Sequence, residues 1–507
     1  MASGSRTRSG TRSPTGTASR GRSRTRSGAT RSARRRSAMP RIVVLGAGVC
    51  GTAAALLLAR DGHEVTVLER DPEPVPDSPE EAWSRWARKG VAQFRGPHFL
   101  QARAREVLDR ELPDVRDALE AAGGAWVDPI QRLPAAIADR APRPVDGRLR
   151  SLSARRPVVE YVFAQAAEAE PGLTVRRGVT VAALTVRGGP GTPHVTGVRT
   201  REGEELAADL VVDAMGRGSR LPRWLRDAGA AAPHEEVEDC GFVYYTRFFR
   251  SADGRVPEPR VGALATPVGS LTILTLPSDR GTWCVTLFLS ARDTPLRRLR
   301  DPERWAAVVA ACPLHAHWLE GAPITGVEAT GGVLDRYRRL VSDGRPVATG
   351  LVLVADAWAC TNPSLARGIA LGLDHAARLR DTVRAHPDSP SHLAEAWDAV
   401  TEEEFTPWYR ATVAVDRARL AEIDAIRAGA EPPRPADPGA AVRAGFALAA
   451  MQDADMFRAF IEVVGCLTLP GEVLARPGVA ERILSLAAEA TPPRLGPSRD
   501  ELLALVS

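Results

Sequence analysis

The first strong pattern of apolar positions begins at residue 41. The run RIVVL (41–45) is rich in β-branched residues and predicts a buried strand. The segment Val49–Arg60 predicts a helix, and HEVTVLER (63–70) predicts a second strand. A strand, a helix and a strand within ~30 residues form the βαβ unit of a dinucleotide-binding fold.

Further elements follow as far as residue 212. Residues 98–123 carry apolar side chains at helical spacing, and Pro157–Glu170 predicts another helix. Strands are expected near Thr174–Arg176, Val179–Leu184, His194–Thr200 and Leu210–Val212. Helices and strands therefore mix through this part of the chain, as in an α/β domain.

The pattern changes between residues 241 and 290. The β-rich runs GFVYYTRFF, SLTILTL and TWCVTLFL are separated by turns and lack helical crossovers. They predict an antiparallel sheet, which is a different architectural unit. A last strand, LVLVA (351–355), leads into a helix expected to start near Pro363. Beyond residue 375 the pattern is helical, interrupted by the linker EPPRPADPG.

Composition changes the picture mainly at the N-terminus. The chain has 507 residues, 44% hydrophobic and 25% charged, which is ordinary for a globular protein. Residues 1–40 hold eleven arginines and no acid, so the remainder carries −6 against +5 for the whole chain. The basic balance is thus no argument for nucleic acid binding. We expect residues 1–38 to be a disordered basic tail, and we favour a mispredicted start, with Met39 as initiator, over a nucleic-acid-binding arm.

Cysteine usage and hydropathy bear on location. The six cysteines are scattered without a C-x-x-C pair, which favours reduced thiols and a cytoplasmic protein. The uncharged run Ile42–Ala59 follows three arginines and could be misread as a signal or membrane helix. Three glycines interrupt that run with the spacing of a nucleotide-binding turn, which explains the run without a membrane helix. We therefore expect a soluble protein without a membrane partner.

That pattern is G-x-G-x-x-G, formed by Gly46, Gly48 and Gly51 between a strand and a helix. The first glycine permits the tight turn, the second lets backbone approach a pyrophosphate, and the third lets helix pack on strand. The intervening Val49 and Cys50 lie in the first helical turn, where unpaired N–H groups bind phosphates.

Glu69 ends the second strand, eighteen residues after Gly51. A carboxylate at this point is placed to accept hydrogen bonds from ribose hydroxyls. The sequence therefore predicts a bound dinucleotide.

Two later segments carry a resemblance to a known family. They are DLVVDAMGRGSRLPRW (209–224) and LVADAWACTNPSLARG (353–368). Together with the glycine fingerprint they resemble the single-component FAD-dependent monooxygenases of the p-hydroxybenzoate hydroxylase type. Residues 90–124 resemble a subgroup related to polyketide-tailoring epoxidases and hydroxylases. The likeness covers about residues 40–385.

The resemblance implies roles for individual residues. Asp356 corresponds to the aspartate that hydrogen-bonds the ribityl chain of FAD, and Arg156 to an arginine along the flavin. The loop and helix after Asp356 approach the pyrimidine end of the ring. The remaining cofactor-binding candidates are Arg70, Val181, Asp213, Gly216, Pro363, Arg367, Gly368 and Ile369.

The chain departs from the family pattern at four positions. Ala355 and Ala366 stand where glycines are usual, Ala370 replaces an asparagine, and Met215 replaces an aspartate for which Asp213 could substitute. These departures concern the docking of NAD(P)H more than the binding of FAD.

The substrate side gives weaker signals. Alternation along GFVYYTRFF gives two strand faces, one with Phe242, Tyr244, Thr246 and Phe248 and the other with Val243, Tyr245, Arg247 and Phe249. One face could roof the flavin pocket, with Arg247 or a tyrosine such as Tyr245 meeting a polar substrate group, unless the strand is an ordinary half-buried one. His98 is a further catalytic candidate, with a packing role as the alternative. His315 and His317 lack neighbouring ligands in the sequence, so no metal site is predicted.

We therefore predict an α/β fold with a Rossmann-like FAD-binding domain, an inserted antiparallel β-sheet substrate domain and a helical C-terminal region. The expected ranges are 1–38 for the tail, 39–235 with 341–385 for the FAD domain (85–150 lying near the flavin), 236–340 for the sheet domain and 386–507 for the helices.

The predicted function is a monooxygenase that uses FAD, NAD(P)H and O2 to hydroxylate or epoxidise an apolar small organic molecule of secondary metabolism. The alternatives are a flavin dehydrogenase or reductase and a non-catalytic flavoprotein. Halogenation is disfavoured because flavin halogenases use a lysine amine beside a W-x-W motif. This chain has no W-x-W, and its only lysine is Lys89 in the polar stretch SRWARKG.

Overall fold

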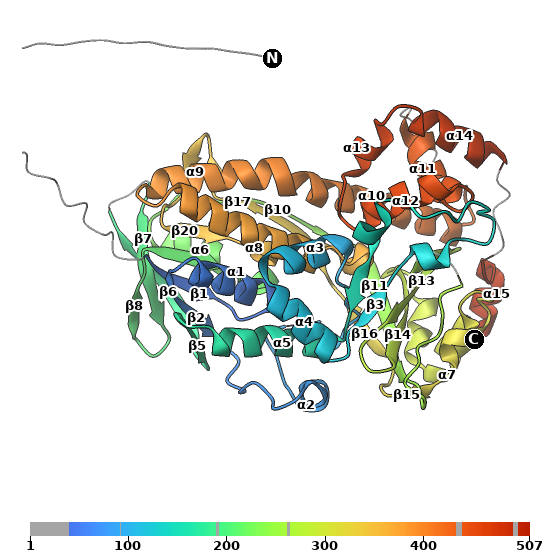
Figure 1. The fold of residues 1–507 in the computed structure, drawn as a ribbon, viewed down its shortest axis with the longest axis horizontal. Helices are drawn as coiled ribbons and strands as arrows, with labels where there is room; N and C mark the ends of the chain where they lie inside the picture. The colour runs from blue at the N-terminus through green and yellow to red at the C-terminus, as the bar shows by residue number, and fades with distance from the viewer. Residues whose placement is uncertain (1–39, 92, 189–191, 261–263, 432–438, 490–494) are drawn as a thin grey trace, which may run out of the picture. The chain divides into compact units, whose positions relative to one another are not determined.

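The computed structural model describes residues 40–507, apart from 92, 189–191, 261–263, 432–438 and 490–494. The expectations for the N-terminal tail and for most of the Pro-rich linker lie outside the described residues. Residues 39–507 form one compact unit (Figure 1).

A five-stranded parallel sheet contains the βαβ unit predicted from the sequence. Its order is β20–β9–β1–β2–β5, with every neighbouring pair parallel. Val44 of β1 pairs with Val67 of β2 and Val212 of β9, so apolar runs are buried at its centre. The strands are β1 (Arg41–Leu45), β2 (Glu64–Glu69), β5 (Leu173–Arg177), β9 (Leu210–Asp213) and β20 (Leu351–Leu353).

Layers cover both faces of this sheet. One face packs on α1 (Val49–Arg60), α8 (Gly368–Ala385) and α9 (Pro390–Val400). The other packs on a meander of β6 (Val181–Arg187), β7 (His194–Thr200) and β8 (Glu205–Ala207), and on α6 (Leu221–Asp227). Against the outer side of α1 lie α3 (Ala102–Glu111), α4 (Pro113–Ala121) and α5 (Arg156–Ala169).

Two helix predictions differ in detail from the structure. Residues 98–123 form two helices, because Pro113 cannot continue α3 and instead starts α4. The helix expected near Pro363 begins at Gly368, since a 3-10 turn at Pro363–Leu365 is followed by Ala366 in the left-handed conformation. The second interruption lengthens the loop before α8 to include residues 363–367.

The antiparallel sheet predicted from the sequence is confirmed. Its strand order is β12–β13–β14–β11–β15, with β16 also paired to β11. Both faces are covered, so every residue of β13 and β14 is buried. The bounds are β11 (Phe242–Arg250), β12 (Ala265–Val268), β13 (Leu271–Pro277), β14 (Thr282–Ser290), β15 (Ala322–Pro323) and β16 (Glu328–Gly331). The helices α7 (Pro302–Ala310) and α15 (Arg499–Leu505) pack on one face of this sheet.

The C-terminal region is helical, as predicted. The 22-residue α10 (Thr406–Arg427) continues on from α9 toward a group of shorter helices (Figure 1). Those helices are α11 (Gly439–Ala450), α12 (Ala454–Val464), α13 (Pro470–Leu474) and α14 (Val479–Glu489).

The remaining elements are short. They are α2 (Pro79–Ser84), the pair β3 (Ala125–Val127) and β4 (Ser151–Ser153), the sheet of β10 (His234–Asp239), β17 (Leu334–Arg339) and β21 (Ala359–Cys360), and the pair β18 (Val341–Ser342) and β19 (Arg345–Pro346). In the part of the chain that the structure describes, no helix combines the length and apolar character needed to cross a bilayer.

Candidate functional site

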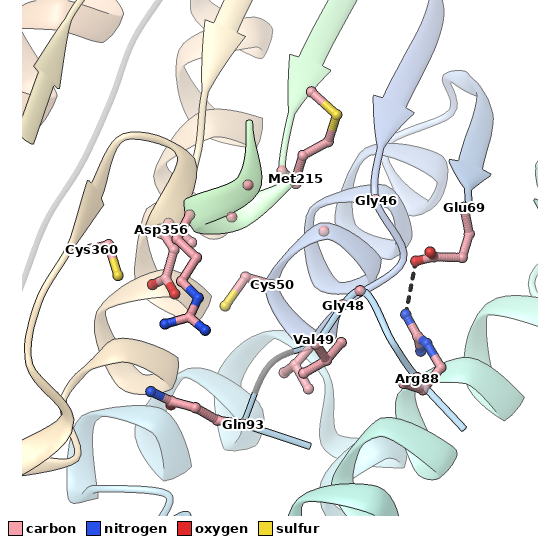
Figure 2. A pocket seen from close by; sticks show the side chains of 18 of the residues that line it. Gly46, Gly48, Val49, Cys50, Glu69, Arg88, Gln93, Met215, Asp356 and Cys360 are labelled. Atoms are coloured by element: carbon pink, nitrogen blue, oxygen red, sulfur yellow. Dashed lines mark hydrogen bonds and ion pairs between the residues drawn. The ribbon is translucent and has the colours of Figure 1, made fainter. Parts of the chain in front are cut away.

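A cavity of about 590 Å³ opens where the carboxyl ends of β1, β2, β9 and β20 meet. In open α/β sheets ligands bind at this edge. Its walls come from the glycine turn, the segment after β2, residues 88–91, 93 and 97–99, and the loops after β9 and β20. Figure 2 shows the turn at Gly46 and Gly48 in the middle, Glu69 and Arg88 on one side, and Asp356 with Cys50 and Cys360 on the other.

Each fingerprint glycine has a separate steric reason. Gly46 has φ +99°, and a Cβ there would lie 2.8 Å from the Ala214 carbonyl oxygen. A Cβ on Gly51 would lie 2.2 Å from the Gly46 oxygen, so only glycine lets α1 pack so closely. Gly48 is different, because a Cβ there would meet nothing within 4 Å. The space beside Gly48 belongs to the cavity, as expected for a phosphate that approaches the backbone.

The start of α1 leaves its N–H groups available to a ligand. Gly48 is the N-cap and has no side chain to satisfy them. Val49 and Cys50 line the cavity in this first turn. The Cys50 thiol also packs on Gly372 of α8, where a Cβ would lie 2.4 Å from the sulfur. Burial, together with the charge of Asp356, raises the pKa of Cys50 to about 12, so the thiol stays protonated.

Glu69 lines the cavity and also holds the turn. Its carboxylate accepts hydrogen bonds from the backbone N–H of Ala47 and of Asp71, both at 2.9 Å. Arg88 Nη2 donates to the same carboxylate at 2.8 Å (Figure 2). Glu69, the residue predicted to bind the ribose, is thus fixed in place by three donors; Oε2 accepts two of these bonds, and Oε1 accepts one and retains capacity for another.

Asp356 lines the other end of the cavity. Burial raises the pKa of its carboxyl, while the positive charges of Arg156 and Arg217 oppose that rise. Ala355, just before it, has φ +50°, and its N–H donates to Nδ1 of His375 at 3.1 Å. Burial lowers the pKa of His375 to about 3, which keeps the imidazole neutral and able to accept this bond.

Most of the predicted cofactor residues lie around this one cavity. Arg156 lines it and also forms an ion pair with Glu160 at 2.6 Å. The other predicted residues that line it are Gly46, Gly48, Val49, Cys50, Gly51, Glu69, Arg70, Val181, Gly216, Asp356, Pro363, Gly368 and Ile369.

Asp213 and Arg367 do not line the cavity. Asp213 is fully buried behind the β9 loop and accepts hydrogen bonds from Met215 N and Ser219 Oγ. Arg367 points away, its guanidinium donating to Thr412 Oγ1 at 2.9 Å. Both support loops of the cavity from outside.

Of the three catalytic candidates, only His98 lines the cavity. Tyr245 lies in the apolar cluster on the sheet face away from the cavity, and Arg247 donates to the Thr325 carbonyl at 3.3 Å. Neither lines the cavity. His98 does line it; burial and the charge of Arg156 lower its pKa to about 3, and Nδ1 lies 3.0 Å from the Gly96 oxygen. This histidine is therefore neutral at physiological pH.

The structure adds residues that the sequence reasoning missed. Tyr244, on the opposite face from Tyr245, donates its hydroxyl proton to Oδ1 of Asn362 at 2.5 Å, and Asn362 lines the cavity. Arg88 is buried against Glu69, Asp71 and Glu160, and Gln93 lines the cavity from the same segment. The sequence signals for this wall were the family resemblance of residues 90–124 and the expectation that residues 85–150 lie near the flavin.

The residues present fit FAD. The cavity joins an uncapped helix N-terminus, a free volume at Gly48 and a carboxylate at each end, which suit a pyrophosphate, a ribose and a ribityl chain. The described residues contain no cluster of His, Cys, Asp and Glu suited to a metal ion. Lys89 is exposed and lies at the cavity wall, next to Gly90, whose N–H donates to Asp71.

Comparisons with known proteins bear on the family of this chain. Residues 41–76 match the FAD dependent oxidoreductase family. Protein Rv3254 of Mycobacterium tuberculosis is 31% identical over 373 residues, covering 68% of this chain and 73% of that protein. Kynurenine 3-monooxygenase of Salinispora tropica is 27% identical over 377 residues, covering 70% and 75%.

A solved structure shows the same fold. PqsL of Pseudomonas aeruginosa, in complex with 2-aminobenzoylacetate, superposes with a TM-score of 0.55 and 17% identity, covering 76% of this chain and all of that one. With its glycine turn, cavity and relatives taken together, the chain belongs to the FAD-dependent oxidoreductases and is similar in sequence and in fold to flavin monooxygenases.

Proposed function

We propose that this flavin monooxygenase inserts one oxygen atom of O2 into an apolar small organic molecule, by hydroxylation or epoxidation, at the Asp356 end of the cavity. The proposal rests on the side chains that line this end of the cavity. Phe99, Pro97 and Ala366 make it apolar, while Gln93 and Asn362 offer neutral hydrogen-bonding groups. The charged groups at that end are Asp356 and the arginines Arg156 and Arg217 beside it, while the other side chains form a wall that suits the apolar part of an organic molecule.

The chain's own residues have binding and positioning roles in this account. FAD, when bound, supplies the redox and oxygen chemistry. The N-terminus of α1 binds phosphate, and Glu69 and Asp356 orient the two ends of the cofactor. The neutral His98 adds a hydrogen-bonding ring without a charge. The aromatic cluster of Phe242, Tyr244, Phe248 and Phe288 excludes water from the sheet side.

The proposed reductant is NAD(P)H, and the proposed setting is the secondary metabolism of the cytoplasm. The relative named kynurenine 3-monooxygenase supports hydroxylation of an aromatic ring as the first reaction to try. The scattered cysteines, all six free, support a reducing compartment.

The test uses the FAD-loaded protein with NAD(P)H, ¹⁸O-labelled O2 and a panel of aromatic and polyketide-like compounds, including kynurenine. We expect a product that carries one labelled oxygen atom, detected by mass spectrometry. Oxidised products without label, formed equally under nitrogen with an artificial electron acceptor, would contradict the proposal and favour a flavin dehydrogenase.

A further inference from the structure

One face of the long C-terminal helix α10 carries buried polar and aromatic side chains and lies against the cofactor site. Trp408, Thr412 and Asp416 recur every four residues and therefore share one face of the helix. They are at most 4% exposed. This face packs on the loop between β20 and α8, which lines the cavity with Asn362, Pro363 and Ala366.

Two hydrogen bonds join that loop to α10. Ser364 Oγ donates to Asp416 Oδ1 at 2.6 Å, and Arg367 Nη1 donates to Thr412 Oγ1 at 2.9 Å. The Arg367 guanidinium also lies 5.2 Å above the Trp408 ring, at cation–π distance. Every polar or aromatic member of the α10 row therefore contacts the loop.

The loop needs such support because of its backbone. Ala366 has φ +51°, the left-handed region that a residue with a Cβ adopts only at a cost. Backbone of this kind persists where the surrounding structure over-determines it. Gln101 of the segment before α3 donates to the Leu365 carbonyl at 3.0 Å, so the turn is held by a side chain outside α10 as well.

Burying the carboxyl of Asp416 against this loop costs free energy. It is buried, its Oδ2 has no hydrogen-bond partner among the described residues, and the buried Asp335 carboxyl lies near enough to repel its charge. An apolar side chain would cover Ser364 at lower cost in free energy. What the carboxyl adds is the hydrogen bond that it accepts from Ser364.

We propose that Asp416 is a positioning residue of the cofactor site: through Ser364 it fixes the loop Thr361–Arg367 against the cavity, and α10 is thereby part of the active site. This inference rests on the assignment of the cavity to FAD. It gives the C-terminal region, which the family resemblance does not reach, a defined role.

The experiment compares Asp416→Ala, Asp416→Asn and a control on the same helix, Asp424→Asn. Asp424 is partnered by Arg427 and Arg292, away from the loop. In flavin-free protein, hydrogen–deuterium exchange is measured for peptides that cover residues 361–367. In parallel, FAD binding is measured by fluorescence quenching, and the visible spectrum of the bound flavin is recorded.

We expect Asp416→Ala to speed exchange in the loop and to weaken FAD binding by about tenfold, with a shifted flavin spectrum. Asp416→Asn keeps an oxygen that accepts from Ser364, so it should restore both readouts, and Asp424→Asn should change neither. If Asp416→Ala fails to fold, Ser364→Ala replaces it with the same expectations.

Unchanged loop exchange and unchanged FAD affinity in Asp416→Ala and Ser364→Ala would overturn the inference. So would an equal loss in Asp416→Asn, because the hydrogen bond would then not be the operating contact. If the unaltered protein binds no FAD, the cofactor assignment fails instead, and loop exchange still decides whether Asp416 holds the loop.

Discussion

The backbone N–H of Ala47 donates to the Glu69 carboxylate at 2.9 Å, so the end of β2 holds the glycine turn that follows β1. Two features that the sequence places 22 residues apart are therefore one structural unit. Arg88 completes it by donating to the same carboxylate. Binding of an adenosine pyrophosphate at this end requires both the turn and the carboxylate to be in place.

The first prediction separates binding from folding at the glycine turn. Gly48→Val should leave the free energy of unfolding of the flavin-free protein within about 0.5 kcal/mol, because its Cβ meets no protein atom. It should weaken FAD binding by at least about tenfold, since the side chain takes up cavity volume. Denaturant unfolding and FAD titration measure the two effects.

Gly51→Val is the matched control. Its Cβ would lie 2.2 Å from the Gly46 oxygen, so it should destabilise the fold itself by roughly 3 kcal/mol or more. Normal FAD affinity in Gly48→Val would show that no phosphate lies beside this residue.

The second prediction distinguishes the faces of β11. Tyr244→Phe removes the donor to Asn362 and should destabilise the protein by about 1–3 kcal/mol, because a buried acceptor is left unpaired. It should also shift the visible spectrum of bound flavin, since Asn362 lines the cavity. Tyr245→Phe, on the other face, should leave the spectrum unchanged. A spectral shift in Tyr245→Phe alone would reverse this assignment of faces.

These two tyrosines show where sequence reasoning reaches its limit. Alternation along β11 was correct, yet it could not tell which face lies toward the cavity. The usual guide is a polar outer face, but here apolar clusters cover both faces of the sheet. The choice is made by packing between segments far apart in the chain.

The sequence predicted elements correctly where they depend on residues close together in the chain. The spacing of Gly46, Gly48 and Gly51 between two apolar runs is a signal within about 30 residues of chain, so the sequence indicated the βαβ unit with bounds within one residue of those observed. The start of α8 was placed at Pro363 because proline favours a first helical turn. The left-handed Ala366 moves that start to Gly368. The contacts of its neighbours with α10 and Gln101, which hold this turn, depend on tertiary structure.

The third prediction concerns pH and Asp416. Burial raises the pKa of this carboxyl from an ordinary value near 3.8 to about 7; the hydrogen bond from Ser364, the nearby amide of Asn362 and the charge of Arg367 oppose the rise, and the charge of Asp335 adds to it. The folded state therefore binds the proton more tightly than the unfolded state. This contribution to stability is complete below pH ~4 and is lost as the pH rises through about 7.

Asp416→Asn lacks this titration. Between pH 4 and pH 7 the unfolding free energy of the unaltered protein should fall relative to that of Asp416→Asn. Above about pH 7 the difference should level off. Denaturant unfolding across that range measures it. A difference that stays constant with pH would mean that the carboxyl titrates at its ordinary value.

The fourth prediction concerns the lysine. Lys89→Arg should retain oxygenation, because the exposed amine beside Gly90 takes no part in the account. Halide added to the reaction should not enter the product. Arginine stays protonated and is a poor nucleophile, so it could not replace a catalytic lysine amine. A halogenated product that disappears in Lys89→Arg would identify a halogenase instead.

The central claim is that the cavity at the end of the parallel sheet binds FAD, and the most direct test is the flavin content of the purified protein. We predict a yellow protein whose extract contains FAD and no FMN, in an amount equal to the chain. Asp356→Ala should lower that amount, because this carboxylate lines the far end of the cavity. A protein that contains FMN or takes up no flavin, or full FAD content in both Gly48→Val and Asp356→Ala, would contradict the account.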